Sequence, residues 1–232
     1  AEGCHLFREE DPDGCSQHPL REAILAARRS DVVILCLGLD PAMEGEEGDA
    51  YNCTASGDKL DLELPASQKL LYREIVKTGK PVIFVNVSGS CLNLCDQDRE
   101  CAAVLQCFYP GAEGGHALAD ILFGKVSPSG RLPVTFYKSA DDLPDFTDYS
   151  MKGRTYRFFE GEPLYPFGHG LSYTSFAENW LDGETVEVRN TGKMDAWHTV
   201  LKFAREPHPQ LVGFRKVWVP AGETVTVQVR QD

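Results

Sequence analysis

The residues best suited to chemistry lie in one short acidic stretch in the first quarter of the chain. Residues 40–49 hold five carboxylates, which are Asp40, Glu44, Glu46, Glu47 and Asp49. A carboxyl group that is partly buried near other carboxylates can have a raised pKa, and a general acid working near neutral pH needs one. The stretch is therefore a candidate source of a proton donor, and a solvated acidic loop would have the same composition.

Other side chains that often do chemistry are less well placed. Ser88-Gly89-Ser90 follows an apolar run and could form a turn that presents a nucleophilic serine, but the G-x-S-x-G pattern of such turns is absent. A serine hydrolase is therefore disfavoured. The six histidines do not cluster in the sequence, so no metal site is predicted. We interpret His116 as a residue at a helix start and His169 as a structural hydrogen-bonding residue.

Two glycine-containing stretches resemble phosphate-binding loops only in part. Residues 111–115 lie between a predicted strand and a predicted helix, but Glu113 stands where G-x-G-x-x-G needs its second glycine. The pair Gly124-Lys125 is followed by Val126 and lacks the upstream glycine of a P-loop. Both stretches are predicted to be structural turns, so no cofactor is expected, and a flavodoxin-like cofactor-binding protein is disfavoured.

The elements that must position the acidic stretch alternate between strand and helix. Apolar runs at 32–39, 82–87 and 103–108 are separated by helical periodicity, and a further helix is predicted at 116–123. This alternation predicts an α/β fold with a mostly parallel sheet flanked by helices. The run 32–39 is predicted to be buried on both faces, because it is continuously apolar. It leads into a predicted loop over residues 40–63, at the edge where open parallel sheets bind ligands.

The pattern changes in the second half of the chain. Residues 132–137 are predicted to form an edge strand, because Pro133 cannot donate to a sheet ladder. Alternating polar and apolar residues at 185–189, 200–203 and 224–229 then predict half-buried strands. These strands indicate a small antiparallel β-sandwich module.

Composition narrows the possible partners and the compartment. The chain has 232 residues and a formal net charge of −12, without the clustered Lys and Arg that nucleic-acid binding needs. It has no apolar run of about 20 residues that could span a bilayer, and no visible signal peptide. Nucleic acid and membrane are therefore not expected partners.

The eight cysteines are predicted to be mostly free thiols. Cys36 and Cys107 fall inside apolar runs, where cysteine behaves as a small hydrophobic residue. A disulfide between Cys4 and Cys15 is the strongest alternative. Free thiols are typical of a reducing compartment, which favours a cytoplasmic location.

A series of motifs, in order along the chain, resembles glycoside hydrolase family 3. The motifs combine an acidic segment after a strand with several Gly- and Pro-containing turns. They are residues 37–40, 44–47, 58–68, 109–115, 119–124, 128–133 and 165–173. Residues 1–137 resemble the C-terminal α/β-sandwich domain of the family, without its N-terminal part. Residues 138–175 would form a linker, and residues 176–232 resemble an incomplete fibronectin type III-like domain.

The resemblance implies a retaining exo-acting β-glycosidase, such as a β-glucosidase or a β-xylosidase. Residues 153–159 are more similar to the β-xylosidase side. Such chemistry uses two carboxyl groups about 5 Å apart, one a nucleophile and the other an acid/base. In the family the nucleophile is an Asp of an N-terminal barrel domain, which this chain lacks. The acid/base is a Glu that follows a small residue in a loop of the α/β-sandwich domain.

That pattern implies Glu46 as the acid/base, with Glu44 and then Glu47 as alternatives. The chain departs from the family where Asp49-Ala50 replaces an Asp-Arg pair, and Asp58-Lys59 is a later possible equivalent. The expected substrates are oligosaccharides or aryl β-glycosides with a terminal non-reducing β-linked sugar. The expected partner is the missing barrel, and the chain alone is expected to be inactive.

A non-catalytic carbohydrate-binding or structural module is the alternative function. Sugar binding favours an aromatic platform on the protein surface. All three tryptophans lie in the predicted β-module, at positions Trp180, Trp197 and Trp218.

Overall fold

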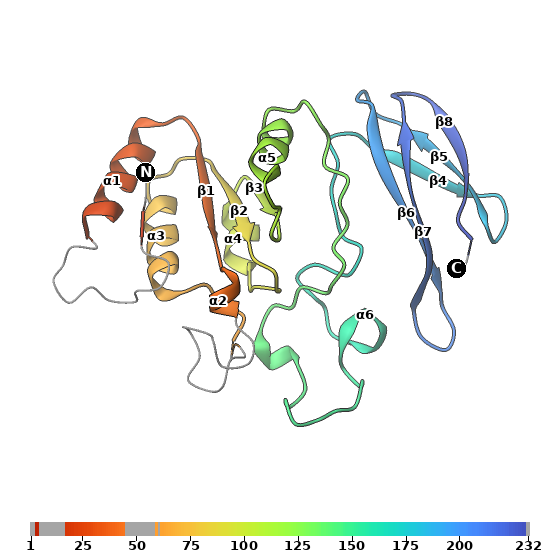
Figure 1. Ribbon diagram of the computed structural model, residues 1–232, viewed down its shortest axis with the longest axis horizontal. Helices are drawn as coiled ribbons and strands as arrows, with labels where there is room; N and C mark the ends of the chain where they lie inside the picture. Colours follow the sequence, from red (N-terminus) through yellow and green to blue (C-terminus); the bar gives the residue numbers. More distant parts are fainter. Residues whose placement is uncertain (1–2, 5–16, 45–58, 60, 231–232) are drawn as a thin grey trace. The chain divides into compact units, whose positions relative to one another are not determined.

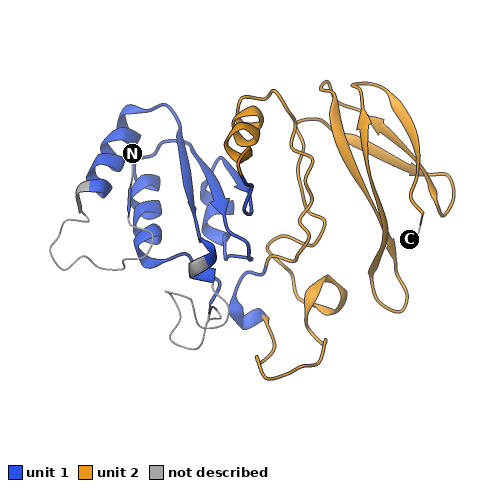
Figure 2. Ribbon diagram, viewed as in Figure 1, with its two compact units in different colours: residues 1–111, 137–142 blue, residues 112–136, 143–232 orange. Residues whose placement is uncertain are grey.

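The computed structural model describes residues 3–4, 17–44, 59 and 61–230 (Figure 1). Two compact units divide the chain (Figure 2). Unit 1 comprises residues 1–111 and 137–142, and unit 2 comprises residues 112–136 and 143–232. None of the helices in the described ranges is long and apolar enough to cross a membrane.

Unit 1 is built on a parallel sheet with strand order β1-β2-β3. Its strands are β1 (Val33–Gly38), β2 (Val82–Val87) and β3 (Ala103–Gln106). Its helices are α1 (Gln17–Arg29), α2 (Pro41–Glu44), α3 (Ala66–Val76), α4 (Cys95–Glu100) and the 3-10 turn η1 (Ala140–Asp142). In the register, Cys36 lies beside Val85, and Val85 beside Leu105. Strand and helix alternate along the chain as the apolar pattern predicts.

One face of this sheet packs against α3. Tyr72 of α3 meets Phe84 of β2 edge to face, with ring centroids 6.0 Å apart. Leu35 of β1 and Ile75 of α3 are buried in the same layer. The apolar stripe of α3 thus forms the core of unit 1, together with alternate residues of the strands.

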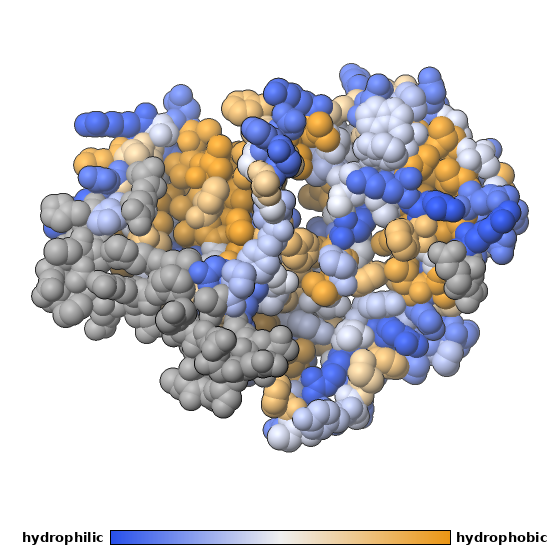
Figure 3. Space-filling model, viewed as in Figure 1, coloured by the Kyte–Doolittle hydropathy of each residue, from blue (hydrophilic) through white to orange (hydrophobic). Residues whose placement is uncertain are grey.

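The other face of β1 is open in the described part of the chain. The side chain of Ile34 is 48% exposed, and Cys36 of the same face is also exposed. Figure 3 shows a hydrophobic patch over this strand. The prediction that β1 is buried on both faces is therefore wrong. The apolar residues of β1 would allow other elements to pack on both faces of the strand, but the described residues cover only one face.

Unit 2 contains an antiparallel β-sandwich and two helices, α5 (Gly114–Leu122) and α6 (Thr155–Phe158). One sheet has the order β4-β5-β8, with β4 at Phe176–Trp180, β5 at Thr185–Asn190 and β8 at Thr224–Gln228. The second sheet pairs β6 (Ala196–Ala204) with β7 (Gln210–Val219). Valines of both sheets and Val229, which follows β8, form one core, which consists of Val186, Val188, Val200, Val219 and Val229. The predicted sandwich is thus confirmed, with β4 and β7 as strands that the pattern did not predict.

The predicted edge strand at 132–137 is wrong. This segment runs beside residues 164–169 and forms one isolated bridge, between Phe136 and Tyr165. The backbone N–H of Leu132 bonds to the carbonyl of His169 at 2.8 Å. Pro133 lies between these two points and has no N–H to donate, so the bonds do not join into a ladder.

Six cysteines fall within the described residues, and no two of these six form a disulfide with each other. They are Cys4, Cys36, Cys91, Cys95, Cys101 and Cys107. This agrees with the prediction of mostly free thiols, whereas Cys15 lies outside the described residues. Cys36 is exposed rather than buried. Strand β3 ends before Cys107, and Phe108 adopts a positive φ of 52°, which is incompatible with a continuing strand.

Candidate functional site

The carboxyl end of β1 is fixed by a side chain of α3. The amide group of Gln68 accepts a hydrogen bond from the Gly38 N–H at 2.9 Å and donates one to the Gly38 carbonyl at 2.7 Å. Gln68 is 1% exposed. Gly38 has φ +150°, and a Cβ there would lie 1.9 Å from the carbonyl oxygen of Val87. Only glycine allows this close approach of β1 and β2, so the point at which the acidic stretch begins is held tightly.

The acidic stretch begins with a short helix, α2, and not with the loop that the sequence predicts. Asp40 accepts a hydrogen bond from the backbone N–H of Met43 at 2.8 Å. Pro41 is the first helical residue, where its missing N–H has no intrahelical partner to lose. This turn carries Glu44 to the end of the helix.

The carboxylate of Glu44 is surrounded by donors from the turn after β2 and the segment after β3. The backbone N–H groups of Gly89 and Ser90 bond to it at 3.0 and 2.7 Å, and the Ser90 hydroxyl at 2.6 Å. The Tyr109 hydroxyl donates a further short hydrogen bond. A Cβ at Gly89 would lie 2.6 Å from both the Glu44 carboxylate and the Tyr109 ring. The Ser-Gly-Ser sequence thus forms a carboxylate-binding turn.

These contacts change the pKa values of the two acidic groups. Partial burial acts to raise the pKa of Glu44, but the hydrogen bonds from Ser90, Tyr109 and Gly89 together hold it below its ordinary value of 4.5. Burial, and then the bond to this carboxylate, raise the pKa of Tyr109. The sequence suggested a raised pKa for a carboxyl in this stretch. For Glu44 the direction is the opposite, because its donors outweigh its burial.

Lys59 lies at the far side of the undescribed segment 45–58 and contacts the same turn. Its ammonium group donates to the Ser90 hydroxyl at 3.4 Å. Burial lowers the pKa of Lys59, and the negative charge of Glu44 opposes that effect. Ser90 therefore contacts both Glu44 and Lys59, which flank the segment. Glu46 and Glu47 belong to this segment and lie outside the described residues.

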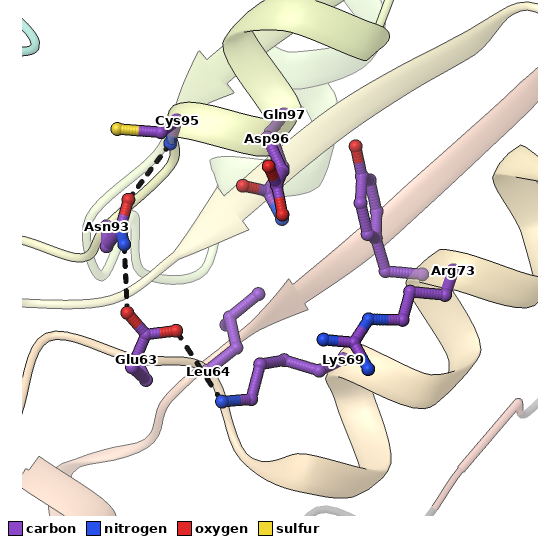
Figure 4. Close-up of a pocket in the computed structure, with 9 residues that line it drawn as sticks. Glu63, Leu64, Lys69, Arg73, Asn93, Cys95, Asp96 and Gln97 are labelled. Carbon is purple, nitrogen blue, oxygen red and sulfur yellow. Dashed lines mark hydrogen bonds and ion pairs between the residues drawn. The ribbon is translucent and has the colours of Figure 1, made fainter. Parts of the chain in front are cut away.

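A pocket of unit 1 lies between α3 and α4 (Figure 4). Its one Glu, Glu63, accepts a hydrogen bond from Asn93 at 2.9 Å and pairs with Lys69 at 3.5 Å. The residues that line it are Glu63, Leu64, Lys69, Tyr72, Arg73, Asn93, Cys95, Asp96 and Gln97. The Glu63 carboxylate is thus bonded to these two partners, and the Asp96 carboxylate of the same pocket pairs with Arg99 at 2.6 Å.

The remaining candidate residues have structural contacts. His116 lies in the first turn of α5, with its ring nitrogen 2.8 Å from the Glu113 carboxylate. His169 stacks on the Tyr165 ring, with centroids 4.9 Å apart. Arg154 bonds to the carbonyls of the segment 145–150. Among the described residues, no group of three His, Cys, Asp or Glu side chains converges as a metal-binding set.

Comparisons with known proteins agree with the motifs. Residues 8–173 match the glycosyl hydrolase family 3 C-terminal domain. A xylan 1,4-beta-xylosidase of Xylanibacter ruminicola is 40% identical, over 90% of this chain and 26% of its own length. A periplasmic beta-glucosidase of Salmonella typhimurium is 34% identical, over 91% of this chain and 30% of its own length. The chain therefore spans less than a third of either relative.

Solved structures give the same result for the fold. The Bifidobacterium adolescentis GH3 beta-glucosidase superimposes with a TM-score of 0.80 at 29% identity, covering 99% of this chain and 36% of that one. The GH3 exo-beta-xylosidase XlnD superimposes with a TM-score of 0.76 at 26% identity, covering 99% of this chain and 34% of that one. The chain belongs to glycosyl hydrolase family 3, and it contains the C-terminal domain of that family.

Proposed function

We propose that this chain is part of a retaining exo-β-glycosidase that removes terminal non-reducing β-linked sugars. In this proposal it supplies the general acid/base, Glu46. The observation that carries the proposal is the fixed position of Glu44 at the carboxyl edge of the parallel sheet. Glu46 is only two residues further along the chain, at the edge where such sheets bind ligands.

The contacts of Glu44 favour Glu46 as the proton donor. A general acid must carry a proton at the working pH. The Glu44 carboxylate accepts hydrogen bonds from Gly89, Ser90 and Tyr109, and its lowered pKa keeps it ionised at neutral pH. We assign Glu44 to positioning, because its contacts and those of Lys59 attach the ends of the intervening segment to the Ser90 turn. Glu47 is the third candidate.

The second carboxylate of the reaction would come from outside this chain. A retaining glycosidase needs a nucleophile that forms a covalent glycosyl-enzyme intermediate. We propose that an Asp of an N-terminal barrel supplies it, since the relatives extend far beyond the region matched here. The 232-residue chain alone is then inactive. We take the substrates to be β-glucosides or β-xylosides, because one relative is named a beta-glucosidase and another a beta-xylosidase.

The test uses the full-length enzyme and two aryl glycosides that differ in leaving-group acidity. A poor leaving group needs protonation as the glycosidic bond breaks, whereas a nitrophenolate does not. We expect Glu46→Gln to lower kcat/KM about 10²- to 10⁴-fold on the poor leaving group and far less on the activated one. Steady-state kinetics on both substrates provides the measurement.

Matched variants identify which Glu acts. Glu47→Gln should leave the ratio of the two kcat/KM values unchanged, and Glu44→Gln should affect both substrates equally. An equal loss on both substrates for Glu46→Gln would refute its role as the acid. Turnover of an aryl β-glycoside by the 232-residue chain alone, above the uncatalysed rate, would refute the requirement for a second domain.

A further inference from the structure

The outer face of the β6-β7 sheet carries two neighbouring tryptophans. Trp197 of β6 lies directly opposite Trp218 of β7, and each is 44% exposed. The alternate residues of the same strands point inward, where Val200 and Val219 are fully buried. The two indole rings therefore stand on a rigid sheet whose other face forms the module's core.

The rings and one lysine form a compact group, which we call the tryptophan platform (Trp197, Trp218 and Lys216). The ring centroids are 5.6 Å apart with an interplanar angle of 65°, so the edge of one ring faces the other. The ammonium group of Lys216 lies 5.9 Å from the centroid of Trp197. Neither indole N–H donates a hydrogen bond to any of the described residues. The platform thus has aromatic surface and unused donors.

An exposed indole leaves a large apolar area in water, whereas burial against a ligand recovers that area and can satisfy the N–H. Part of the same face is already covered, because Tyr156 bonds to Leu211 N and meets Phe203 edge to face. The platform lies at the other end of the strand pair, beyond Thr199, whose hydroxyl bonds to Ser129.

We propose that the tryptophan platform binds a linear β-1,4-linked pyranose chain. A pyranose whose hydroxyls are equatorial has apolar C–H faces that stack on indole, and its hydroxyl oxygens accept hydrogen bonds from the indole N–H and from Lys216. The identity of the occupant rests on the proposed glycosidase function. A neutral ligand fits the platform, because its one cation, Lys216, already lies over the Trp197 ring.

The test follows tryptophan fluorescence of the 232-residue chain during titration with xylohexaose, cellohexaose and, as an α-linked control, maltohexaose. We expect saturable binding of at least one β-linked hexasaccharide, and affinity about tenfold or more weaker in Trp218→Ala and in Trp197→Ala. Trp180→Ala is the matched control, because Trp180 is 37% exposed on β4 of the other sheet. Isothermal titration calorimetry checks the affinities independently of the removed fluorophores.

Several outcomes would overturn the platform. They are no binding of either β-linked hexasaccharide, equal binding of maltohexaose, or unchanged affinity in both platform variants. A dimer in sedimentation that Trp218→Ala dissociates, without sugar binding, would assign the surface to a second copy instead. If Trp218→Ala fails to fold, Trp218→Phe and Lys216→Ala replace it, with affinity mostly kept in the first and weakened in the second.

The proposal of a sugar-binding tryptophan platform and the proposal of Glu46 as the acid/base can be refuted separately. In the full-length enzyme, Trp218→Ala should leave kcat/KM on an aryl β-glycoside with a poor leaving group unchanged, while binding of the hexasaccharide by the 232-residue chain weakens. Glu46→Gln should show the reverse pattern. If the wild-type protein does not bind the hexasaccharide but has aryl glycosidase activity, only the platform proposal is rejected. Intact binding without any glycosidase activity would reject the proposed catalytic function alone.

Discussion

At the scale of single residues, Glu44 is the best-defined acidic group near the proposed site. Its carboxylate takes donors from two different segments that follow neighbouring strands. The acidic stretch could be identified from the sequence, but the pKa shifts of its carboxyl groups could not. Composition suggested raised pKa values, and the outcome for Glu44 depended on Ser90 and Tyr109, which are 46 and 65 residues further along the chain.

Replacement of Glu44 by Gln should make stability less sensitive to acid. Hydrogen bonds to a charged group stabilise more than neutral ones, so we expect a loss of about 1–3 kcal/mol in the free energy of unfolding at pH 7. The folded-state pKa is lowered, so this stabilisation is present above pH 4.5 and is lost as the pH falls through the folded pKa. Urea unfolding at pH 7 and at pH 3 measures the difference.

Glu113→Gln is the control for this experiment, because among the described residues its exposed carboxylate pairs only with the exposed His116 ring. It should change the unfolding free energy little at either pH. A difference between wild type and Glu44→Gln that is as large at pH 3 as at pH 7 would contradict the role of the ionised carboxylate.

At the scale of elements, the longer helices and the first strands could be predicted because their patterns are local. Strand β2 matches its apolar run, and α3 follows its apolar stripe. Helix α4 is polar and short, so it has no periodic signal. Strand β7 was not predicted, because Gly213 and exposed apolar residues obscure its alternation. The hydrogen bonds that join Gln68 of α3 to Gly38 of β1 were also not predicted, because a glutamine near the start of a helix does not indicate its distant partner.

The hydrogen bonds between Gln68 and Gly38 lead to a prediction whose pH dependence is opposite to that of Glu44. Gln68→Glu should destabilise unit 1 at pH 7 by about 2–4 kcal/mol, because a buried ionised carboxylate would face the Gly38 carbonyl. Burial raises the pKa of that introduced carboxyl, so stability should recover as the pH falls, when the protonated group can again donate.

Gln68→Leu provides the comparison, because it leaves both Gly38 backbone groups without a partner at every pH. Urea unfolding at pH 7 and pH 4.5, each referred to wild type, distinguishes the two variants. The double hydrogen bond would be disproved as the source of stability if Gln68→Glu did not recover relative to Gln68→Leu.

At the scale of the whole molecule, the family and both kinds of fold could be predicted, but the cover of the parallel sheet could not. The continuous apolar run 32–39 predicted a strand buried on both faces. Ile34 and Cys36 are exposed on one of them. The matched region spans 26% and 30% of the length of two relatives, and we expect chain outside the 232 residues to cover this face in the full-length protein.

The exposed thiol of Cys36 is therefore a chemical reporter of whether that face is covered. We expect iodoacetamide to label Cys36 at least tenfold more slowly in the full-length protein than in the 232-residue chain, as followed by peptide mass spectrometry. Cys95 is the internal control, because it lies at the start of α4 and should react equally in both. Equal labelling of Cys36 in both proteins would mean that the full-length protein also presents this face to solvent. One alkylation experiment thus measures how complete the fold is, without any assay of sugar chemistry.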